Sequence, residues 1–297
     1  MTSLAQLLSM IGVILLVLIL LAGAAVIYAS RQVMRLPANN PAHFLKRGRD
    51  PSCRRVVVCA GASMVQGRVG YSFVDLLAGR FPQDCFVNAG FNGDVALHLA
   101  RRLDDVIECQ PDAVAILIGT NDVIGTLDVE SWRRYRRNKT LSGPTSLDQY
   151  RDALREIVRR LKVGATPHIA LCALPVLGED LASIPNQRIC AFNAALQEIA
   201  AQESVAYLPV FERESALLAE YQSAEGHAGR PFPTDFKTYG SLMFRAMLQH
   251  YLLGRSFDDV SRRNDFFLKT DLIHGNSREA GIIADEIAAF LKSAFAS

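Results

Sequence analysis

The run Arg55-Val-Val-Val-Cys-Ala-Gly-Ala-Ser-Met-Val-Gln-Gly67 lies at the centre of the fold that this chain predicts. Its apolar, largely β-branched part, residues 56–60, predicts a strand that is buried on both faces. The strand ends at Gly61, and a hydroxyl group follows two residues later at Ser63. In an open parallel sheet, ligands and reacting groups gather at the carboxyl ends of the strands. Ser63 is therefore expected at such an edge, as a turn or helix-cap residue or as a nucleophile.

The segments after this strand alternate between strand and helix patterns. Apolar residues at helical spacing predict helices over residues 71–81, 95–109, 147–162 and 186–203. Short apolar runs predict further strands over residues 85–87, 112–118, 167–174 and 205–210. This alternation implies right-handed crossovers and helices on both faces of the sheet. We predict an α/β fold, a three-layer α/β/α sandwich with a mostly parallel five-stranded sheet, preceded by one transmembrane helix.

The amino-terminal segment has the composition of a membrane anchor. Residues 11–29 carry no charge, and at about 1.5 Å per residue they can cross a hydrocarbon core of about 30 Å. The alternative, a cleaved signal peptide, needs a basic start, but residues 1–30 contain no Lys or Arg. We predict a transmembrane anchor at 1–30, a tether at 31–52 that is extended over 37–41, and a folded domain at 53–297.

Charge and cysteine usage bear on the location of the domain. The basic residues near the span all follow it, at Arg31, Arg35, Lys46, Arg47 and Arg49, so the positive-inside rule predicts a cytoplasmic domain. The six cysteines have no metal-ligand spacing, and we expect all of them to be reduced, as on a cytosolic face. A net charge of +2 argues against a nucleic-acid partner. Neither a metal nor an organic cofactor is expected.

Two segments leave alternatives open. Residues 132–139 are strongly basic, and they form either a solvated loop or a contact with anionic lipid headgroups. Residues 211–268 interrupt the alternation and are predicted to be an insertion containing an apolar helix from Tyr239 to Leu253. The apolar stripe of that helix either packs against the core or forms a lid or the wall of an acyl-chain pocket.

Polar groups gather where the predicted strands end, and a further pair lies near the carboxyl terminus. Gly93 lies in a glycine-rich turn after the second strand, and Asn121 follows the third strand. Asp271 and His274 are three residues apart, so the carboxylate can bind one imidazole nitrogen and leave the other to take a proton from a hydroxyl. Together with Ser63, this set predicts hydrolysis by nucleophilic catalysis.

Four segments together resemble the SGNH (GDSL-type) hydrolases over roughly residues 54–295. They are Gly61-Ala-Ser63, Asn88-Ala-Gly-Phe-Asn-Gly93-Asp, Gly119-Thr-Asn121-Asp and Asp271-Leu-Ile-His274. The resemblance implies that Ser63 is the nucleophile, His274 its base and Asp271 the residue that orients the base. It also implies an oxyanion hole formed by the backbone N–H groups of Ser63 and Gly93 and the side-chain amide of Asn121.

The chain departs from that family at two positions. Ala62 stands where the family usually has Asp, and Gly275 stands where Pro commonly follows the histidine. A conventional α/β-hydrolase is not indicated, because Val65 replaces the last glycine of the Gly-x-Ser-x-Gly elbow. The resulting expectation is a membrane-anchored serine esterase, lipase-like, that cleaves acyl esters, including lipid esters, through an acyl-enzyme. The alternatives are an O-acetylesterase acting on an envelope glycan, with the domain outside the cytoplasm, or a non-catalytic membrane-anchored scaffold.

Overall fold

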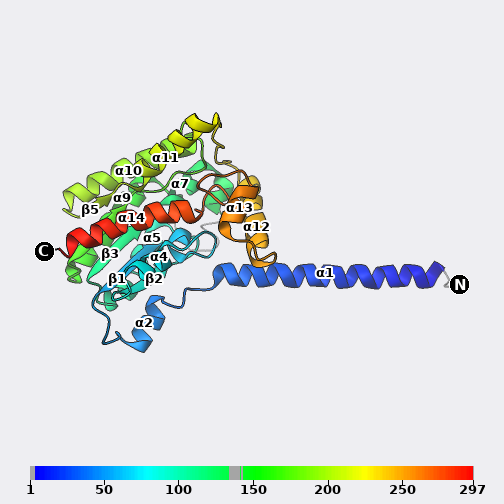
Figure 1. Ribbon diagram of the computed structural model, residues 1–297, viewed down its shortest axis with the longest axis horizontal. Helices are drawn as coiled ribbons and strands as arrows, with labels where there is room; N and C mark the ends of the chain where they lie inside the picture. Colours follow the sequence, from blue (N-terminus) through cyan, green and yellow to red (C-terminus); the bar gives the residue numbers. More distant parts are fainter. Residues whose placement is uncertain (1–3, 134–140, 142, 297) are drawn as a thin grey trace.

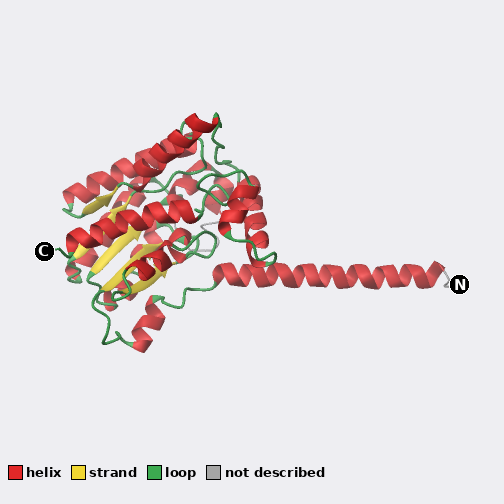
Figure 2. Ribbon diagram, in the orientation of Figure 1, coloured by secondary structure: helices red, strands yellow, loops and turns green. Residues whose placement is uncertain are grey.

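The computed structural model describes residues 4–133, 141 and 143–296. Its centre is a five-stranded parallel sheet in the order β2-β1-β3-β4-β5 (Figure 2). The strands are β1 (Val56–Gly61), β2 (Cys85–Gly90), β3 (Ala113–Leu117), β4 (His168–Cys172) and β5 (Ala206–Leu208). Nearly all their side chains are buried, as expected for a sheet covered on both faces.

Helices cover both faces of the sheet, and alternate strand residues point to each layer. Val56 and Val58 pack with one layer, whereas Val57 and Cys59 pack with the other. The first layer contains α5 (Ala96–Arg101), α6 (Asp104–Glu108), α9 (Leu147–Val163) and α10 (Ile184–Gln202). The second contains α4 (Phe73–Arg80), α11 (Val210–Glu225) and α14 (Ser277–Ala294). The predicted three-layer sandwich is therefore confirmed.

The segment predicted to be an insertion begins later than expected. Residues 210–225 form α11, a regular layer helix that packs against α14. The additional helices are α12 (Phe236–Tyr251) and α13 (Phe257–Arg263). On α12, Tyr239 and Ala246 are buried, but Phe244 is 41% exposed. The apolar stripe of α12 is thus only partly covered by the domain.

The amino-terminal helix α1 (Leu4–Met34) projects from the domain (Figure 1). Its segment from Gln6 to Met34 contains an 18-residue stretch with a mean hydropathy of 3.1 and is long and apolar enough to cross a membrane. The helix continues beyond residue 30, and its last turns pack against α12, where Ala29 is fully buried. The orientation of the helix relative to the domain therefore depends on a packed contact.

The segment predicted to be an extended tether is instead docked on the domain. It contains a short helix, α2 (Pro41–Arg47), which Asn40 caps by accepting a hydrogen bond from the backbone N–H of His43. Asn39 donates to the carbonyl of Phe86 at 3.0 Å and so ties the segment to β2. The prediction missed this helix, although a capping Asn followed by Pro at the first helical position is typical of a helix start.

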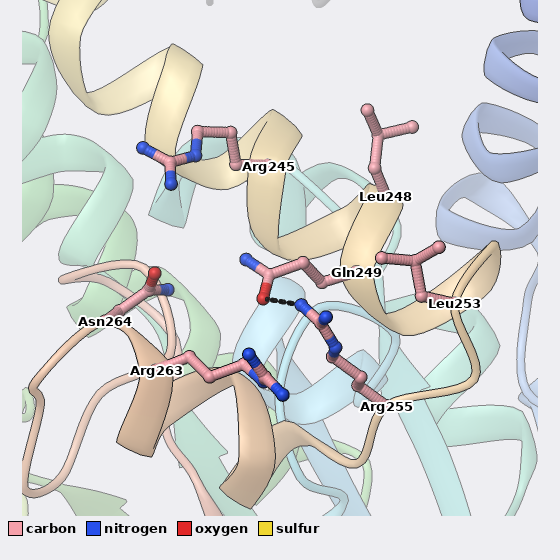
Figure 3. A pocket seen from close by; sticks show the side chains of 7 residues that line it. All are labelled: Arg245, Leu248, Gln249, Leu253, Arg255, Arg263 and Asn264. Atoms are coloured by element: carbon pink, nitrogen blue, oxygen red, sulfur yellow. Dashed lines mark hydrogen bonds between the residues drawn. The ribbon is translucent and has the colours of Figure 1, made fainter.

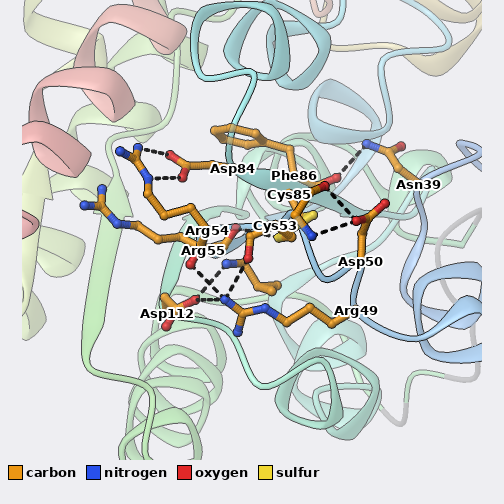
Figure 4. Close-up of a disulfide and its surroundings, with 12 residues drawn as sticks. Asn39, Arg49, Asp50, Cys53, Arg54, Arg55, Asp84, Cys85, Phe86 and Asp112 are labelled. Carbon is orange, nitrogen blue, oxygen red and sulfur yellow. Dashed lines mark hydrogen bonds and ion pairs between the residues drawn. A yellow bond between two sulfur atoms is a disulfide. The ribbon is translucent and has the colours of Figure 1, made fainter.

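The expectation that all six cysteines are reduced is wrong for two of them. Cys53 and Cys85 form a disulfide, with their Cα atoms 5.6 Å apart (Figure 4). The parallel pairing of β1 with β2 places Val56 opposite Cys85, so the residues leading into β1 lie beside Cys85. The cysteines that remain free are Cys59, Cys109, Cys172 and Cys190. The cysteine argument for a cytosolic face therefore fails.

Most of the basic run at 132–139 lies outside the described residues. Trp132 packs partly buried against the core, and Arg133 lies 3.7 Å from the carboxylate of Glu130. The alternatives for the rest of that run stay predictions.

Two short helices, α3 (Ser63–Gln66) and α7 (Thr120–Leu127), begin at the carboxyl ends of β1 and β3 and position the polar residues of the candidate site.

Candidate active site

Ser63 and His274 meet although 211 residues separate them in the sequence. Ser63 is the first residue of α3, directly after β1, and its side chain is 6% exposed. The Nε2 atom of His274 lies 2.9 Å from the Oγ atom of Ser63. The Nδ1 atom of His274 lies 2.8 Å from Oδ2 of Asp271. This arrangement orients the imidazole so that Nε2 can accept the hydroxyl proton.

The turn from Asp271 to His274 is stabilised by the carboxylate that orients the histidine. Oδ1 of Asp271 accepts hydrogen bonds from the backbone N–H groups of Ile273 and His274, at 3.0 and 2.9 Å. Leu272, which directly follows Asp271, has a φ of 75°, a left-handed conformation that costs a non-glycine residue about 1–2 kcal/mol. The Leu272 carbonyl accepts from the N–H of Gly178 at 2.8 Å, which helps to hold this strained residue in place.

The predicted oxyanion-hole residues lie at the same sheet edge. The N–H of Ser63 is at the amino end of α3, where no intrahelical acceptor exists. Gly93 has a φ of 76°, which favours glycine in the turn after β2. The side chain of Asn121 donates to the carbonyl of Asp94 at 2.8 Å, so its amide is fixed against the turn that contains Gly93.

Two further charged residues hold this edge together, and the sequence did not single them out. Arg102 donates to Asp94 at 2.7 Å and to the carbonyl of Gly61 at 2.9 Å, so it joins the turn after β2 to the end of β1. Asp122 accepts a hydrogen bond from the backbone N–H of Ala96 at 3.0 Å. Burial raises the pKa of the Asp122 carboxyl to about 7.

A buried ion pair lies next to the histidine turn. Lys269 and Glu279 form a salt bridge with side chains that are 0% and 1% exposed. A Cβ atom on Gly275 would lie 2.5 Å from Cδ of Glu279, so the Glu279 carboxyl occupies the space that a side chain at residue 275 would need. The proline that commonly follows the histidine in the family would therefore not fit here. Burial raises the pKa of Glu279, while the Lys269 ammonium opposes that rise.

The backbone leading into the histidine turn is held by side chains from other parts of the chain. The carboxylate of Glu179 accepts from the N–H groups of Leu268 and Lys269, at 2.7 and 3.0 Å. Ser261 on α13 donates to the carbonyl of Lys269 at 2.6 Å and accepts from Asn276 at 2.8 Å. The helix that follows α12 therefore supports the turn that carries His274.

The site combines the Ser63 hydroxyl, the His274 imidazole and the Asp271 carboxylate, which contact one another in that order, with backbone N–H groups nearby. The described part of the chain contains no group of three His, Cys, Asp or Glu side chains that could hold a metal ion. Such an arrangement is suited to acyl transfer, in which a serine attacks a carbonyl carbon and donors stabilise the resulting oxyanion.

A family model described as the GDSL-like lipase/acylhydrolase family matches residues 59–232, more than half of the chain. The chain belongs to this family. The predicted resemblance is thereby confirmed, and the protein is an ester-cleaving hydrolase. A search of curated proteins finds no match.

Solved structures share the fold at low sequence identity. An acetylxylan esterase from Geobacillus stearothermophilus aligns with a TM-score of 0.56 and 17% identity, covering 81% of this chain and 95% of the esterase. An alpha/beta hydrolase from the metagenome of Lake Arreo, Spain, aligns with a TM-score of 0.53 and 20% identity, covering 80% and 95% of the two chains. The acetyl xylan esterase AlAXEase aligns with a TM-score of 0.53 and 16% identity, covering 79% and 98%.

Proposed function

We propose that this hydrolase is a serine esterase that cleaves acyl esters through a covalent acyl-enzyme on Ser63. The observation that carries the proposal is the chain of contacts from Ser63 Oγ to His274 Nε2, at 2.9 Å, and from His274 Nδ1 to Asp271, at 2.8 Å. The family match over residues 59–232 supports ester hydrolysis as the reaction class.

In the acylation step, Ser63 Oγ attacks the ester carbonyl carbon while its proton moves to Nε2 of His274. The Asp271 carboxylate stabilises the imidazolium that forms. Negative charge develops on the former carbonyl oxygen, where the N–H groups of Ser63 and Gly93 and the amide of Asn121 can stabilise it. Collapse of the tetrahedral intermediate breaks the bond to the leaving alkoxide, which takes the proton from His274.

In the deacylation step, a water molecule attacks the acyl carbon and gives its proton to His274. The second tetrahedral intermediate collapses, the bond to Ser63 Oγ breaks, and the serine oxygen recovers its proton from the imidazolium. The products are a carboxylic acid and an alcohol, and the enzyme returns to its starting state.

Contacts between the nucleophile loop and the residue that follows α1 favour a lipid ester as the substrate. Gln66, three residues after Ser63, donates from its side chain to the backbone carbonyl of Arg35 at 3.1 Å. Arg68 donates to the same carbonyl at 3.3 Å. The loop that carries the nucleophile is thus attached to the segment just after a helix that is apolar enough to cross a membrane. A lipid ester in that membrane would lie close to the site.

A second candidate, an O-acetylesterase acting on an envelope glycan, is favoured by the disulfide between Cys53 and Cys85. Disulfides persist in oxidising compartments, which the glycan hypothesis requires. Two of the similar solved structures are acetylxylan esterases. The basic residues that follow the uncharged span, beginning at Arg31 in the last turn of α1, favour the opposite orientation, with the domain in the cytoplasm.

The test uses the full chain in neutral detergent with a fluorophosphonate probe and a panel of nitrophenyl esters from acetyl to long acyl chains. We expect Ser63→Ala to abolish both labelling and turnover, and Ser293→Ala, a change at an exposed serine of α14, to preserve them. Equal labelling of wild type and Ser63→Ala would exclude Ser63 as the nucleophile. Absence of labelling and turnover in the wild type would favour the scaffold hypothesis.

Orientation distinguishes the two substrates. A reporter enzyme fused to the carboxyl end, active only outside the cytoplasm, would favour the glycan. The same reporter active only in the cytoplasm would favour an intracellular acyl ester and would exclude an envelope substrate.

A further inference from the structure

A cationic groove lies between α12 and α13, and its lining includes neither Ser63 nor His274. Figure 3 shows the guanidinium groups of Arg255 and Arg263 directed toward each other across the opening, whereas the side chain of Arg245, on α12, points away from both. Its lining contains no carboxylate. The lining residues are Arg245, Leu248, Gln249, Leu253, Arg255, Arg263 and Asn264.

The positive charge of this groove is not neutralised by the residues that the structure describes. Arg255 donates to the neutral amide of Gln249 at 2.8 Å, and none of the three arginines forms an ion pair within the described ranges. By contrast, the neighbouring Arg262 pairs with Asp259 on α13. The guanidinium groups of Arg255 and Arg263 face each other without a counter-charge and so repel one another, and an anion between them would relieve that repulsion.

The position of α1 fixes where this groove lies relative to a membrane. The last turns of α1 pack on α12, and the ribbon of α1 runs beside Leu248 and Leu253 in Figure 3. Tyr251, at the end of α12, donates to the carbonyl of Arg68 at 2.6 Å, and Arg68 in turn donates to the carbonyl of Arg35. These contacts hold the end of α12 at the level where α1 leaves the domain.

In a bilayer that α1 crosses, that level would lie near the boundary. The uncharged part of α1 ends at Ser30, and the first basic residue is Arg31. Leu253 is 61% exposed and Leu252 is 39% exposed at the same level, which suits contact with the acyl boundary. The arginines lie alongside, where headgroup phosphates would be. Guanidinium groups match phosphate oxygens in charge and in hydrogen-bond geometry.

We propose that the groove formed by Arg245, Arg255 and Arg263 binds the phosphate-bearing headgroup of an anionic phospholipid in the bilayer that α1 enters. Leu252 and Leu253 contact the acyl boundary beside it. This contact would fix the domain on the membrane surface through α12 as well as through α1. The proposal is independent of the ester chemistry and of the membrane leaflet, since it uses only the packing of α1 on α12 and the charge of the groove.

The test measures which lipid the full chain retains. Wild type in neutral detergent is incubated with equal amounts of dioleoyl phosphatidylglycerol and dioleoyl phosphatidylcholine, captured and washed, and its bound lipids are quantified by mass spectrometry. We expect phosphatidylglycerol to be retained in clear excess. The triple variant Arg245→Gln/Arg255→Gln/Arg263→Gln is expected to lose this preference, by about fivefold for each arginine, which corresponds to about 1 kcal/mol per basic residue near an anionic surface.

A matched control removes three arginines from the opposite part of the domain, Arg155→Gln/Arg159→Gln/Arg188→Gln on α9 and α10. It should retain the preference of the wild type. An equal loss in both triple variants would show that only net charge matters and would overturn the proposal.

A second measurement separates folding from binding and identifies the source of the phosphate. The thermal midpoint of each variant is measured in neutral detergent alone, with phosphatidylglycerol and with inorganic phosphate. We expect phosphatidylglycerol to raise the midpoint of the wild type and not that of the groove variant. A rise of the same size with inorganic phosphate would indicate a free-anion site and contradict a lipid headgroup. If the groove variant were unfolded without lipid, Arg263→Gln alone would replace it in both measurements.

Discussion

Lys269 offers the sharpest test of how the histidine turn is stabilised. Its side chain is fully buried and pairs with Glu279, which is 1% exposed. Lys269→Met keeps a side chain of similar length but leaves the Glu279 carboxylate without its counter-charge. Breaking a buried pair in this way costs about 3–5 kcal/mol, a large fraction of the roughly 5–15 kcal/mol that stabilises an ordinary domain.

The loss of folding stability in Lys269→Met should depend on pH, and the direction of this dependence follows from the pKa of Glu279. Burial raises this pKa and Lys269 lowers it, so removing Lys269 raises it further. A carboxyl whose folded pKa lies above its unfolded pKa contributes stability at low pH that is lost as the pH rises through the folded value. Relative to wild type, Lys269→Met should therefore be more destabilised at about pH 8 than at about pH 5.

The assay is urea unfolding of the full chain in neutral detergent, followed by the fluorescence of Trp132, the single tryptophan. Trp132 packs against the core of the domain, so it reports on the domain rather than on α1. Lys292→Met, at an exposed lysine of α14, is the control and should stay within about 0.5 kcal/mol of wild type.

The variant Lys269→Met/Glu279→Leu should recover most of the loss, because it removes both charges. A loss below about 1 kcal/mol for Lys269→Met at both pH values, with an unchanged denaturant slope, would refute the reasoning.

Three other perturbations follow from the site. Asn121→Ala should lower kcat by about 10²–10³ with little change in KM, because it removes one of the proposed donors to the developing oxyanion. Steady-state hydrolysis of a nitrophenyl ester measures both constants, and an unchanged kcat would contradict the proposed role. Because burial raises the pKa of Asp122 to about 7, this group should lower the free energy of unfolding by roughly 4 kcal/mol as the pH rises from about 4 to 7. In urea titrations at several pH values, Asp122→Asn should reduce this pH dependence. An unaltered pH profile would show that other groups cause it. Gly275→Ala should destabilise by about 1–3 kcal/mol because its Cβ would clash with Glu279, whereas Gly281→Ala, with open space around it, should be neutral or stabilising; equal midpoints in thermal unfolding of the two variants would argue against the clash.

Local patterns in the sequence were sufficient to predict the sheet, most of the layer helices, the apolar helix and the family, but they assigned α11 to the insertion. The run at 56–60 shows the continuous apolar character of a doubly buried strand, and the helices show their 3.6-residue spacing. The turn from Asp271 to His274 was also predictable, because a separation of three residues brings the two side chains together. The four family segments were sufficient to make Ser63 and His274 candidates for a single site.

Other features arise from contacts that no local pattern specifies. Glu179 holds the backbone of Lys269 from 90 residues away. The Cys53–Cys85 disulfide depends on the pairing of two strands, and the prediction of reduced cysteines failed because thiols at strand ends look alike in sequence whether or not they meet. The docking of Asn39 on β2 also depends on contacts between distant segments, and so does the groove between α12 and α13 that is lined by Arg245, Arg255 and Arg263. The spacing of apolar residues indicates which face of a helix or strand is buried. Which element packs against that face is decided by contacts between segments that are distant in the chain.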